Sequence, residues 1–475
     1  MKTHPTIIQG GLGVAVSSWK LARAVARLGQ LGVVSGTALD QVFARRLQDG
    51  DEGGDMRRGL EGFPFRKMAE RVWNKYFIPG GKAPEQPYQQ LPMHNWDGPV
   101  ERRELCIVAN FVEVALAREG HENPVGVNYL EKVQIPHLPS LYGAMLAGAG
   151  YVLMGAGIPL RIPGALDALA QHQPAAYAMH VAGGEKSENA AVTFTPREFM
   201  EGGLPPLRRP YFLAIIASNV LATTMVKKAN GRVDGFVVEG PTAGGHNAPP
   251  RGKAPLNEAG EPVYGERDVV DLGKLKELGL PFWLAGGYGT PERLREALEA
   301  GAAGVQVGTP FALCAESALR EDYKRAILAS VLAGEIKVFT DPLASPTGFP
   351  FKTVPLKGTV AEAEVYAGRP RYCDLGYLRE AYRLPWGGIG YRCAAEPEAA
   401  YVAKGGSAGK ALGRKCLCNA LLANIGLAQI QAGAYVETGL VTCGDCLIDV
   451  ASFLSNGDGS YGAADVIAKL LGAQG

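Results

Sequence analysis

Residues 282–310 read FWLAGGYGTPERLREALEAGAAGVQVGTP and contain two short apolar runs separated by a helical pattern. The runs, Phe282–Ala285 and Gly304–Val307, each lead into glycine, which is typical of a buried strand followed by a tight turn. Between them, Thr290 is placed to cap a helix that stops at Gly301. The stretch therefore predicts a strand–helix–strand unit in a parallel sheet.

The same rhythm recurs through the first two thirds of the chain. Short, mostly apolar runs alternate with helical patterns, as expected for strands that are buried on both faces. Eight parallel strands close a barrel, so the count predicts a (β/α)8 TIM barrel, an α/β fold, with a doubly wound open sheet as the alternative. The eight predicted strands are Thr6–Gln9, Leu31–Ser35, Val125–Asn128, Tyr151–Met154, Tyr211–Ala217, Gly235–Glu239, Phe282–Ala285 and Gly304–Val307.

Three segments of the barrel are too long to be simple connections. They are residues 40–124, residues 161–207, which include the extended runs Tyr177–Val181 and Ala191–Phe194, and residues 247–267. Long loops on the catalytic face of a barrel often form lids, and a plain surface excursion is the alternative for each segment.

The strand–helix rhythm stops near residue 336. We therefore divide the chain into a barrel, residues 1–335, and a Cys-rich C-terminal extension, residues 336–475, with a lid and an interface as its candidate roles. Within the extension we expect a loop at residues 403–410 and a helix at residues 415–432.

Charge and composition argue against nucleic-acid and membrane partners. The 475 residues include 48 basic and 47 acidic side chains, so no overall field of one sign attracts a polyanion. The beginning, MKTHPTIIQGG, lacks the long apolar region of a signal peptide. The uncharged stretch Leu138–Leu160 contains two prolines and five glycines, so a helix, a turn, a strand and a glycine loop explain it better than a membrane span. We expect a cytoplasmic protein that acts on small molecules.

Glycines follow the last two predicted strands, where barrels typically build a phosphate site. The backbone N–H groups of Gly286, Gly287, Gly308 and Thr309 can converge on a dianion, with the start of a helix behind them. The alternative is a pair of ordinary tight turns.

Other strand ends offer contacts for a flat heterocycle. Gly10, Gly11 and Leu12 follow the first strand, where bare backbone lets a ring lie close to the main chain. The amide of Asn128 can satisfy both a donor and an acceptor of a heterocycle, and Gly155 allows another close backbone approach. Each feature alone is equally consistent with a solvated turn.

A histidine follows the sixth predicted strand. The stretch 235–247 reads GFVVEGPTAGGHN, and it places His246 after a glycine-rich turn on the catalytic face. Because the pKa of histidine lies near neutrality, His246 is a candidate general base, with a structural histidine as the alternative.

Together these motifs resemble the nitronate monooxygenase family, also called 2-nitropropane dioxygenases, over roughly residues 5–330. The FMN-dependent enoyl-ACP reductases share its fold and most of its motifs. The resembling motifs are Ile8-Gln-Gly-Gly-Leu-Gly13, Val127-Asn128, Gly155-Ala-Gly157, Ala243-Gly-Gly-His246, Ala285-Gly-Gly287 and Gly308-Thr309.

The resemblance implies an FMN site and a role for each matching residue. Gly10, Gly11 and Leu12 would pass beneath the isoalloxazine, and Asn128 would meet the ring edge. Glu239, Gly244 and Gly245 would line the ribityl and phosphate side. Gly286, Gly287, Gly308 and Thr309 would bind the phosphate, and His246 would be the catalytic base. Ser218 stands near a position where the family often has a lysine, and we expect it to supply a neutral contact instead.

Three functions follow from this resemblance. The first is a nitronate monooxygenase that oxidises alkyl nitronates or nitroalkanes with O2. The second is a flavin-dependent enoyl-ACP (enoyl thioester) reductase with NAD(P)H as its electron donor. The third is a non-catalytic flavin-binding partner subunit. The expected partners are a small-molecule substrate and O2, with a homodimer or an acyl-carrier protein as further candidates.

Six of the eight cysteines fall between Cys373 and Cys446. Cysteine thiolates can hold zinc or an iron–sulfur cluster, and the four candidates are Cys373, Cys393, Cys416 and Cys418. Their spacing is not that of a standard zinc knuckle, and residues 443–446 add a separate C-x-x-C. We favour the alternative, buried free cysteines, over a metal site.

Overall fold

The computed structural model describes residues 4–183, 190–252, 255–454 and 459–472. All eight predicted strands are present in it within one or two residues of their predicted ends. They are β1 Ile7–Gln9, β2 Gly32–Ser35, β3 Val125–Leu130, β4 Tyr151–Gly155, β8 Tyr211–Ile216, β9 Gly235–Glu239, β10 Phe282–Ala285 and β11 Gly304–Val307.

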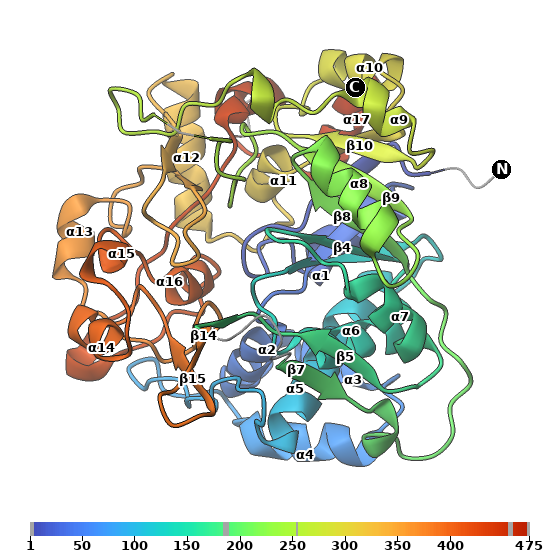
Figure 1. The fold of residues 1–475 in the computed structure, drawn as a ribbon, viewed down its shortest axis with the longest axis vertical. Helices are drawn as coiled ribbons and strands as arrows, with labels where there is room; N and C mark the ends of the chain where they lie inside the picture. The colour runs from blue at the N-terminus through green and yellow to red at the C-terminus, as the bar shows by residue number, and fades with distance from the viewer. Residues whose placement is uncertain (1–3, 184–189, 253–254, 455–458, 473–475) are drawn as a thin grey trace.

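These strands form one sheet in the order β1-β11-β10-β9-β8-β4-β3-β2, with every pair parallel (Figure 1). The residue before β2 closes the ring, because Gln9 N donates to Leu31 O at 2.9 Å and Leu31 N donates to Ile7 O at 3.1 Å. The fold is therefore a (β/α)8 barrel, as predicted, and the open-sheet alternative is wrong.

Apolar side chains fill the inside of the barrel. Successive residues of a strand point to opposite faces, so alternate positions contribute to the interior and the others pack under the helices. The indole of Trp283 is fully buried there, and its Nε1 donates to Pro5 O at 2.8 Å. The buried members of this interior cluster are Ile8, Leu31, Val33, Tyr151, Leu153, Leu213, Val237, Trp283 and Ala285.

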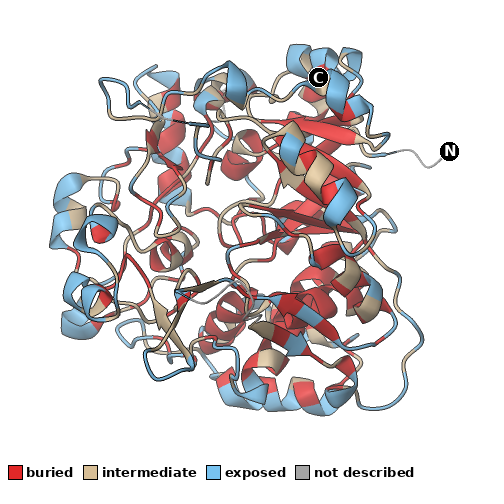
Figure 2. Cartoon of the chain, in the orientation of Figure 1, coloured by how far each residue is buried: buried red, intermediate tan, exposed pale blue. Residues whose placement is uncertain are grey.

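Helices surround the strands, and Figure 2 shows the strands buried while the helices are exposed on their outer faces. The predicted cap is present, since Thr290 Oγ1 accepts from Arg293 N at 3.4 Å and Gly301 has a φ of +84°. The helices between or after the strands are α1 Trp19–Arg27, α6 His137–Leu146, α7 Ile162–Ala170, α8 Asn219–Lys228, α9 Leu272–Lys276, α10 Pro291–Glu299, α11 Thr309–Leu313 and α12 Glu321–Leu332.

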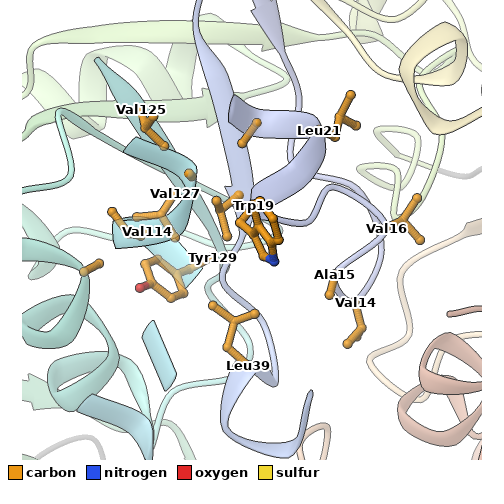
Figure 3. Close-up of a cluster of buried hydrophobic side chains, with 14 of the residues drawn as sticks. Val14, Ala15, Val16, Trp19, Leu21, Leu39, Val114, Val125, Val127 and Tyr129 are labelled. Atoms are coloured by element: carbon orange, nitrogen blue, oxygen red, sulfur yellow. The ribbon is translucent and has the colours of Figure 1, made fainter. Parts of the chain in front are cut away.

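The segment at residues 40–124 is a helical layer rather than an open loop. Its longest helix is buried along most of its length and packs against α1 and α6. Trp19 N donates to Glu113 Oε1 at 2.9 Å, and Figure 3 shows part of the core that the layer shares with the barrel. The helices of this layer are α2 Leu39–Gln48, η1 Glu52–Gly54, α3 Asp55–Leu60, α4 Arg66–Tyr76 and α5 Val100–Arg118.

The two extended runs predicted at residues 161–207 pair with each other in antiparallel fashion, as β5 Ala175–Ala178 and β7 Ala191–Phe194. A further short strand, β6 Val181–Ala182, pairs instead with the extension, and η2 Pro196–Glu198 follows β7. In residues 247–267, η3 Glu266–Asp268 begins just before the end of the segment.

The extension runs along the barrel and returns to it (Figure 1). Its last helix packs against α1, α10 and α11, and η5 packs against α11 and α12. Among the described residues, no helix is long and apolar enough to cross a membrane. The elements are β12 Phe339–Asp341, β13 Phe351–Thr353, α13 Ala363–Gly368, β14 Glu380–Arg383, β15 Ile389–Arg392, α14 Glu398–Ala403, α15 Ala408–Ala411, α16 Leu417–Ala423, η4 Ala432–Ala434, η5 Asp445–Phe453 and α17 Ala463–Leu470.

Two local predictions in the extension need correction. The predicted helix at residues 415–432 is only α16, because Gly426 has a φ of +79° and Asn424 Nδ2 donates to Leu440 O at 2.8 Å, which turns the chain away. The predicted loop at residues 403–410 includes the start of α15 at Ala408.

Candidate functional site

A cavity of about 170 Å³ lies at the carboxyl ends of β1, β9, β10 and β11, and we call it the glycine cavity. Loops from four separated parts of the barrel sequence meet there, together with residues of the extension. Ten residues singled out from the sequence line it: Gly10, Gly11, Leu12, Glu239, Gly244, Gly245, Gly286, Gly287, Gly308 and Thr309.

The glycines after β10 and β11 present backbone N–H groups without acceptors. Gly286 and Gly287 have φ values of +85° and +82°, and a Cβ on Gly286 would lie 2.9 Å from Thr242 Oγ1. Among the described residues, no hydrogen bond uses the N–H of Gly286, Gly287 or Gly308. Helix α10 begins just beyond this turn, so the arrangement suits a bound anion.

No lysine, arginine or histidine stands among the described residues that line the glycine cavity. Two acidic side chains, Glu239 and Asp449, do line it. An anion there would therefore depend on backbone N–H groups and the N-terminus of α10 rather than on a charged side chain.

Two buried amide oxygens beside the first glycine loop have no hydrogen-bond partner among the described residues. They are Asn128 Oδ1 and Gln306 Oε1. A Cβ on Gly11 would lie 2.4 Å from Asn128 Cβ, and a Cβ on Gly10 would lie 3.3 Å from the Gln306 side chain, so both amides pack directly against this loop. Buried acceptors are rarely left unpaired in native proteins, and these two fit the N–H groups of a heterocycle.

Gln306 was missed by the sequence reasoning. The sequence nevertheless offered an indication of its role, because Gln306 is a polar residue within the apolar run Gly304–Val307. Asn128 was predicted, and it packs against Gly11 without itself lining the glycine cavity.

The structure does not bring Gly155 and Ser218 into the glycine cavity. Gly155 packs against Ile215, where an added Cβ would lie 2.9 Å from Ile215 Cβ. Ser218 caps α8, with its Oγ accepting from Leu221 N at 3.0 Å, and it lines a neighbouring cavity.

This neighbouring cavity, of about 230 Å³, contains His246, and we call it the histidine cavity. His246 Nε2 lies 2.7 Å from Ser345 Oγ, and the imidazole packs edgewise against Phe349 and Phe351. Among the described residues, Nδ1 has no hydrogen-bond partner. Burial lowers the pKa of His246 to about 4, so the ring is neutral near pH 7 and can accept a proton.

Glu239, the last residue of β9, lines both the glycine cavity and the histidine cavity. Burial raises the pKa of its carboxyl to about 7, because desolvation disfavours the ionised form. The two cavities are therefore joined at a carboxyl that exchanges a proton near neutrality.

Residues 442–446 of the extension cover one side of the glycine cavity, and we call them the strap. Gly245 N donates to Thr442 Oγ1 at 2.7 Å, and Gly444 N donates to Thr309 Oγ1 at 2.8 Å. A Cβ on Gly244 would lie 2.9 Å from the carbonyl carbon of Cys443. Gly245 and Thr309, which were predicted to bind cofactor, thus already have partners within the chain.

The strap was not predicted as part of the site. Its C-x-x-C spacing drew attention only as a thiol pair, and no local pattern indicates which loop of the barrel it contacts.

The four candidate metal-binding cysteines are neighbours in the structure. A hydrogen bond between Cys373 and Cys393 lowers the pKa of Cys373, and that of Cys393 is raised by the same contact and by burial. Burial raises the pKa of Cys416 and Cys418. No three of the four sulfur atoms lie within 4.8 Å of one another, and free cysteines stay our prediction, with metal binding as the alternative.

Among the described residues, one group does bring three such ligand atoms within 4.8 Å: Asp40, His94 and Cys106. Asp40 is paired there with Arg102 at 2.9 Å and accepts from Tyr377 Oη at 2.6 Å. The guanidinium and imidazole contacts hold the pKa of Asp40 well below its usual range, although burial alone would raise it. The adjacent guanidinium would repel a metal ion, so we interpret the group as a structural network.

Comparison with known proteins bears on the second half of the barrel. Residues 208–341 match the family model described as nitronate monooxygenase. This part of the chain is similar to the nitronate monooxygenase family. The matched segment holds β8 to β11, His246 and the N–H groups of Gly286, Gly287 and Gly308.

A curated relative is also similar to part of the chain. Nitronate monooxygenase of Pseudomonas aeruginosa is 33% identical over 134 residues, which is 26% of this chain and 35% of the relative. The match to this nitronate monooxygenase thus spans about a third of its length.

The chain is also similar to solved structures at low identity. FabK from Thermotoga maritima aligns with 99% of this chain and 92% of its own, with 16% identity and a TM-score of 0.47. Nitroalkane oxidase from Streptomyces ansochromogenes aligns with 74% of this chain and 76% of its own, with 16% identity and a TM-score of 0.38.

Proposed function

We propose that the protein is an FMN-dependent oxidoreductase that oxidises alkyl nitronates or nitroalkanes with O2. The observation that carries this proposal is the glycine cavity, which is lined by three unpaired N–H groups and the unpaired amide oxygen of Gln306, with the unpaired amide oxygen of Asn128 packed behind Gly11. The match of residues 208–341 to the nitronate monooxygenase family model supports the reaction class.

The residues of the glycine cavity fit FMN. The N–H groups of Gly286, Gly287 and Gly308 would hold its phosphate, and the side chains of Asn128 and Gln306 would meet the donors of its ring. When bound there, FMN supplies the electron transfer between substrate and O2.

His246 is the proposed base. Its neutral imidazole would take the acidic α-proton of a nitroalkane, or hold the nitronate anion once it has formed. Ser345 fixes the ring through the 2.7 Å contact at Nε2, which leaves Nδ1 free to accept the proton. The phenyl rings of Phe349 and Phe351 exclude water from the imidazole.

The first test is the visible spectrum of the purified protein and its uptake of FMN. Bound FMN gives two absorption bands in the visible spectrum. Aerobic oxidation of a nitronate is then measured by the formation of the carbonyl product. His246→Asn should lower kcat by about 100-fold or more while FMN stays bound, since a positioned base contributes at least that factor. Protein that remains colourless after reconstitution with FMN would end the proposal.

The same assay separates the other two candidates. If NADPH bleaches the flavin without oxygen and a crotonyl thioester restores it, the protein is an enoyl reductase instead. If the flavin responds to neither substrate, it is a non-catalytic flavin-binding subunit. A homodimer and an acyl-carrier partner remain predictions that size measurement and binding assays would test.

A further inference from the structure

A third cavity, of about 360 Å³, is formed by the residues after β3, the β5–β7 segment and the extension. We call it the basic cavity because five cationic side chains and one carboxylate line it. These six residues are Lys132, Arg379, Arg392, Lys410, Arg414 and Glu380.

Within the part of the chain that the structure describes, only one of its three guanidinium groups has a carboxylate partner. Arg392 pairs with Glu380 at 2.9 Å. Arg379 donates to the carbonyl oxygens of Gly376, at 3.1 Å, and His94. Carbonyl oxygens satisfy N–H donors but carry no net charge, and Cys373 and Glu396 act on Arg379 only from a distance, so among the described residues this guanidinium has no carboxylate in direct contact.

Arg414, like Arg379, donates to carbonyl oxygens rather than to a carboxylate. Its Nη1 donates to the carbonyl oxygens of Leu343, at 2.8 Å, and Ser345, at 2.7 Å. Asp341 acts on it only from a distance and is paired with Lys415 at 3.9 Å. Arg379 and Arg414 are both partly buried, and this burial lowers the pKa of each. An arginine stays charged in a protein, so a desolvated guanidinium without a carboxylate attracts an anion.

Two lysines add charge at the exposed side of the cavity. Lys132 is 4.0 Å from Glu131, with 41% of its side chain exposed, and Lys410 is exposed on α15. Apolar side chains of Val133, Ile135 and Met179 line other parts of the cavity. The cavity therefore suits a ligand that has both an anionic group and an apolar part.

The basic cavity adjoins the histidine cavity through residues 345–349. Ser345 contacts His246 Nε2 through its side chain and accepts from Arg414 through its carbonyl oxygen. Phe349 lines the histidine cavity, and Lys132 Nζ lies 5.5 Å from the centre of its ring. A ligand in the basic cavity is thus separated from the imidazole by one short segment.

We propose that the basic cavity binds the phosphate or carboxylate group of an organic anion, with Arg379 and Arg414 as the inner contacts and Lys132 and Lys410 as the outer ones. Both groups offer oxygens that pair with guanidinium in the same forked geometry. The binding site does not depend on the proposed redox function, because none of these side chains lines the glycine cavity.

Isothermal titration of the full-length protein tests this proposal, with phenyl phosphate and benzoate as the two probes. The protein is first saturated with FMN, so that the glycine cavity is not available to phosphate. We expect saturable one-to-one binding that weakens as salt is raised. The stronger of the two probes identifies phosphate or carboxylate as the natural group.

Variants show where the probe binds. Lys132→Ala and Lys410→Ala each remove one exposed charge and should weaken binding about three- to fivefold, whereas Arg379→Gln should weaken it more than about tenfold. The matched control is Lys227→Ala, an exposed lysine on α8, which should leave the affinity unchanged. Because the two lysines are exposed, their variants should fold normally even if Arg379→Gln does not.

Two results would overturn the proposal. One is the absence of saturable heat with either probe up to about 10 mM, a limit that corresponds to binding weaker than about 3 kcal/mol. The other is binding that persists unchanged in the Lys132→Ala and Lys410→Ala double variant, since the anion would then lie elsewhere. Failure to take up FMN would count against the proposed redox function but would leave this titration interpretable.

Discussion

Individual glycines determine whether the glycine cavity can hold an anion. Gly286 and Gly287 adopt left-handed backbone conformations, which cost a residue with a Cβ about 1–2 kcal/mol. Their N–H groups can face the glycine cavity because glycine adopts the left-handed conformation without steric cost. These positions could be predicted from the sequence, because glycines directly after the last two buried strands of a barrel are typical of a phosphate-binding turn.

Gly287→Ala should strain this turn and displace its N–H groups. A Cβ at residue 287 would also lie 3.2 Å from Cys446 Sγ. We expect FMN affinity to fall at least about tenfold, because the displaced N–H groups would no longer donate hydrogen bonds to the phosphate. The measurement is an FMN fluorescence titration, together with the melting temperature of the cofactor-free protein.

The matched control for this variant is Gly279→Ala. Gly279 has a φ of +68° and open space around its Cβ position, so it carries the same backbone strain away from the cavity. Both variants should lower the melting temperature, and only Gly287→Ala should weaken FMN. Equal FMN affinities for the two variants would contradict the proposed phosphate site.

Glu239→Gln should stabilise the protein at high pH. Burial raises the pKa of Glu239 to about 7 in the folded protein, above its ordinary value of 4.5. The folded state therefore prefers the protonated carboxyl, and stability is lost as pH rises from about 4.5 through 7. At pH 8 the variant should gain at most about 3 kcal/mol in the free energy of unfolding, and at pH 4.5 almost nothing.

Thermal or urea unfolding of the cofactor-free protein at the two pH values measures this difference. Glu258→Gln, at an exposed glutamate, serves as the control and should show no such pH dependence. A gain that is the same at both pH values would show that Glu239 is not desolvated.

At the scale of secondary-structure elements, the eight strands could be predicted from sequence, but the helices and loops that pack around the barrel could not. Apolar runs that end in glycine identify parallel strands because both faces of such strands are buried. The helical layer at residues 40–124 and the early end of α16 depend on distant contacts, such as Asn424 with Leu440, and no local pattern indicates them.

The strap is the element whose role was least accessible from sequence. Its hydrogen bond with Gly245 joins residues 197 positions apart, and the local sequence around neither residue indicates this contact. The same holds for the basic cavity, whose lysines and arginines come from residue 132 and from the extension. Sequence reasoning located the parts contributed by strand ends and missed those that the extension supplies.

Thr442→Val should detach the strap from the barrel. The change leaves Gly245 N–H without its acceptor at 2.7 Å, which costs about 1–3 kcal/mol for a buried donor. We expect lower stability and faster release of FMN, measured by stopped-flow fluorescence. Thr193→Val, at an exposed position of β7, is the control. An unchanged release rate would mean that the strap does not contribute to retention.

At the scale of the whole molecule, the barrel and the extension share one core. Leu447, Val450, Phe453, Val466 and Leu470 of the extension belong to the same hydrophobic cluster as the helices of the barrel. Figure 1 shows α17 beside α10, whereas α13, α14 and α15 lie on the other side of the view. The boundary predicted near residue 336 is therefore crossed by extensive packing.

Differential scanning calorimetry should record a single unfolding transition for the full chain. Units that share a hydrophobic core unfold together, because losing one exposes the apolar surface of the other. Two separate transitions would instead support an independent extension beginning near residue 336. Limited proteolysis between α13 and α16 offers a second measurement, with cleavage expected only after global unfolding.

The glycine cavity is assembled from Gly10 near one end of the chain and from Thr442 near the other. Contacts between residues so far apart in sequence carry a loop-closure entropy that other contacts of the folded chain must offset. A cofactor bound there acts as a noncovalent crosslink between the two ends. Its binding free energy would add to the stability of the folded chain, so the cofactor-free form would be the one more easily cut by proteases.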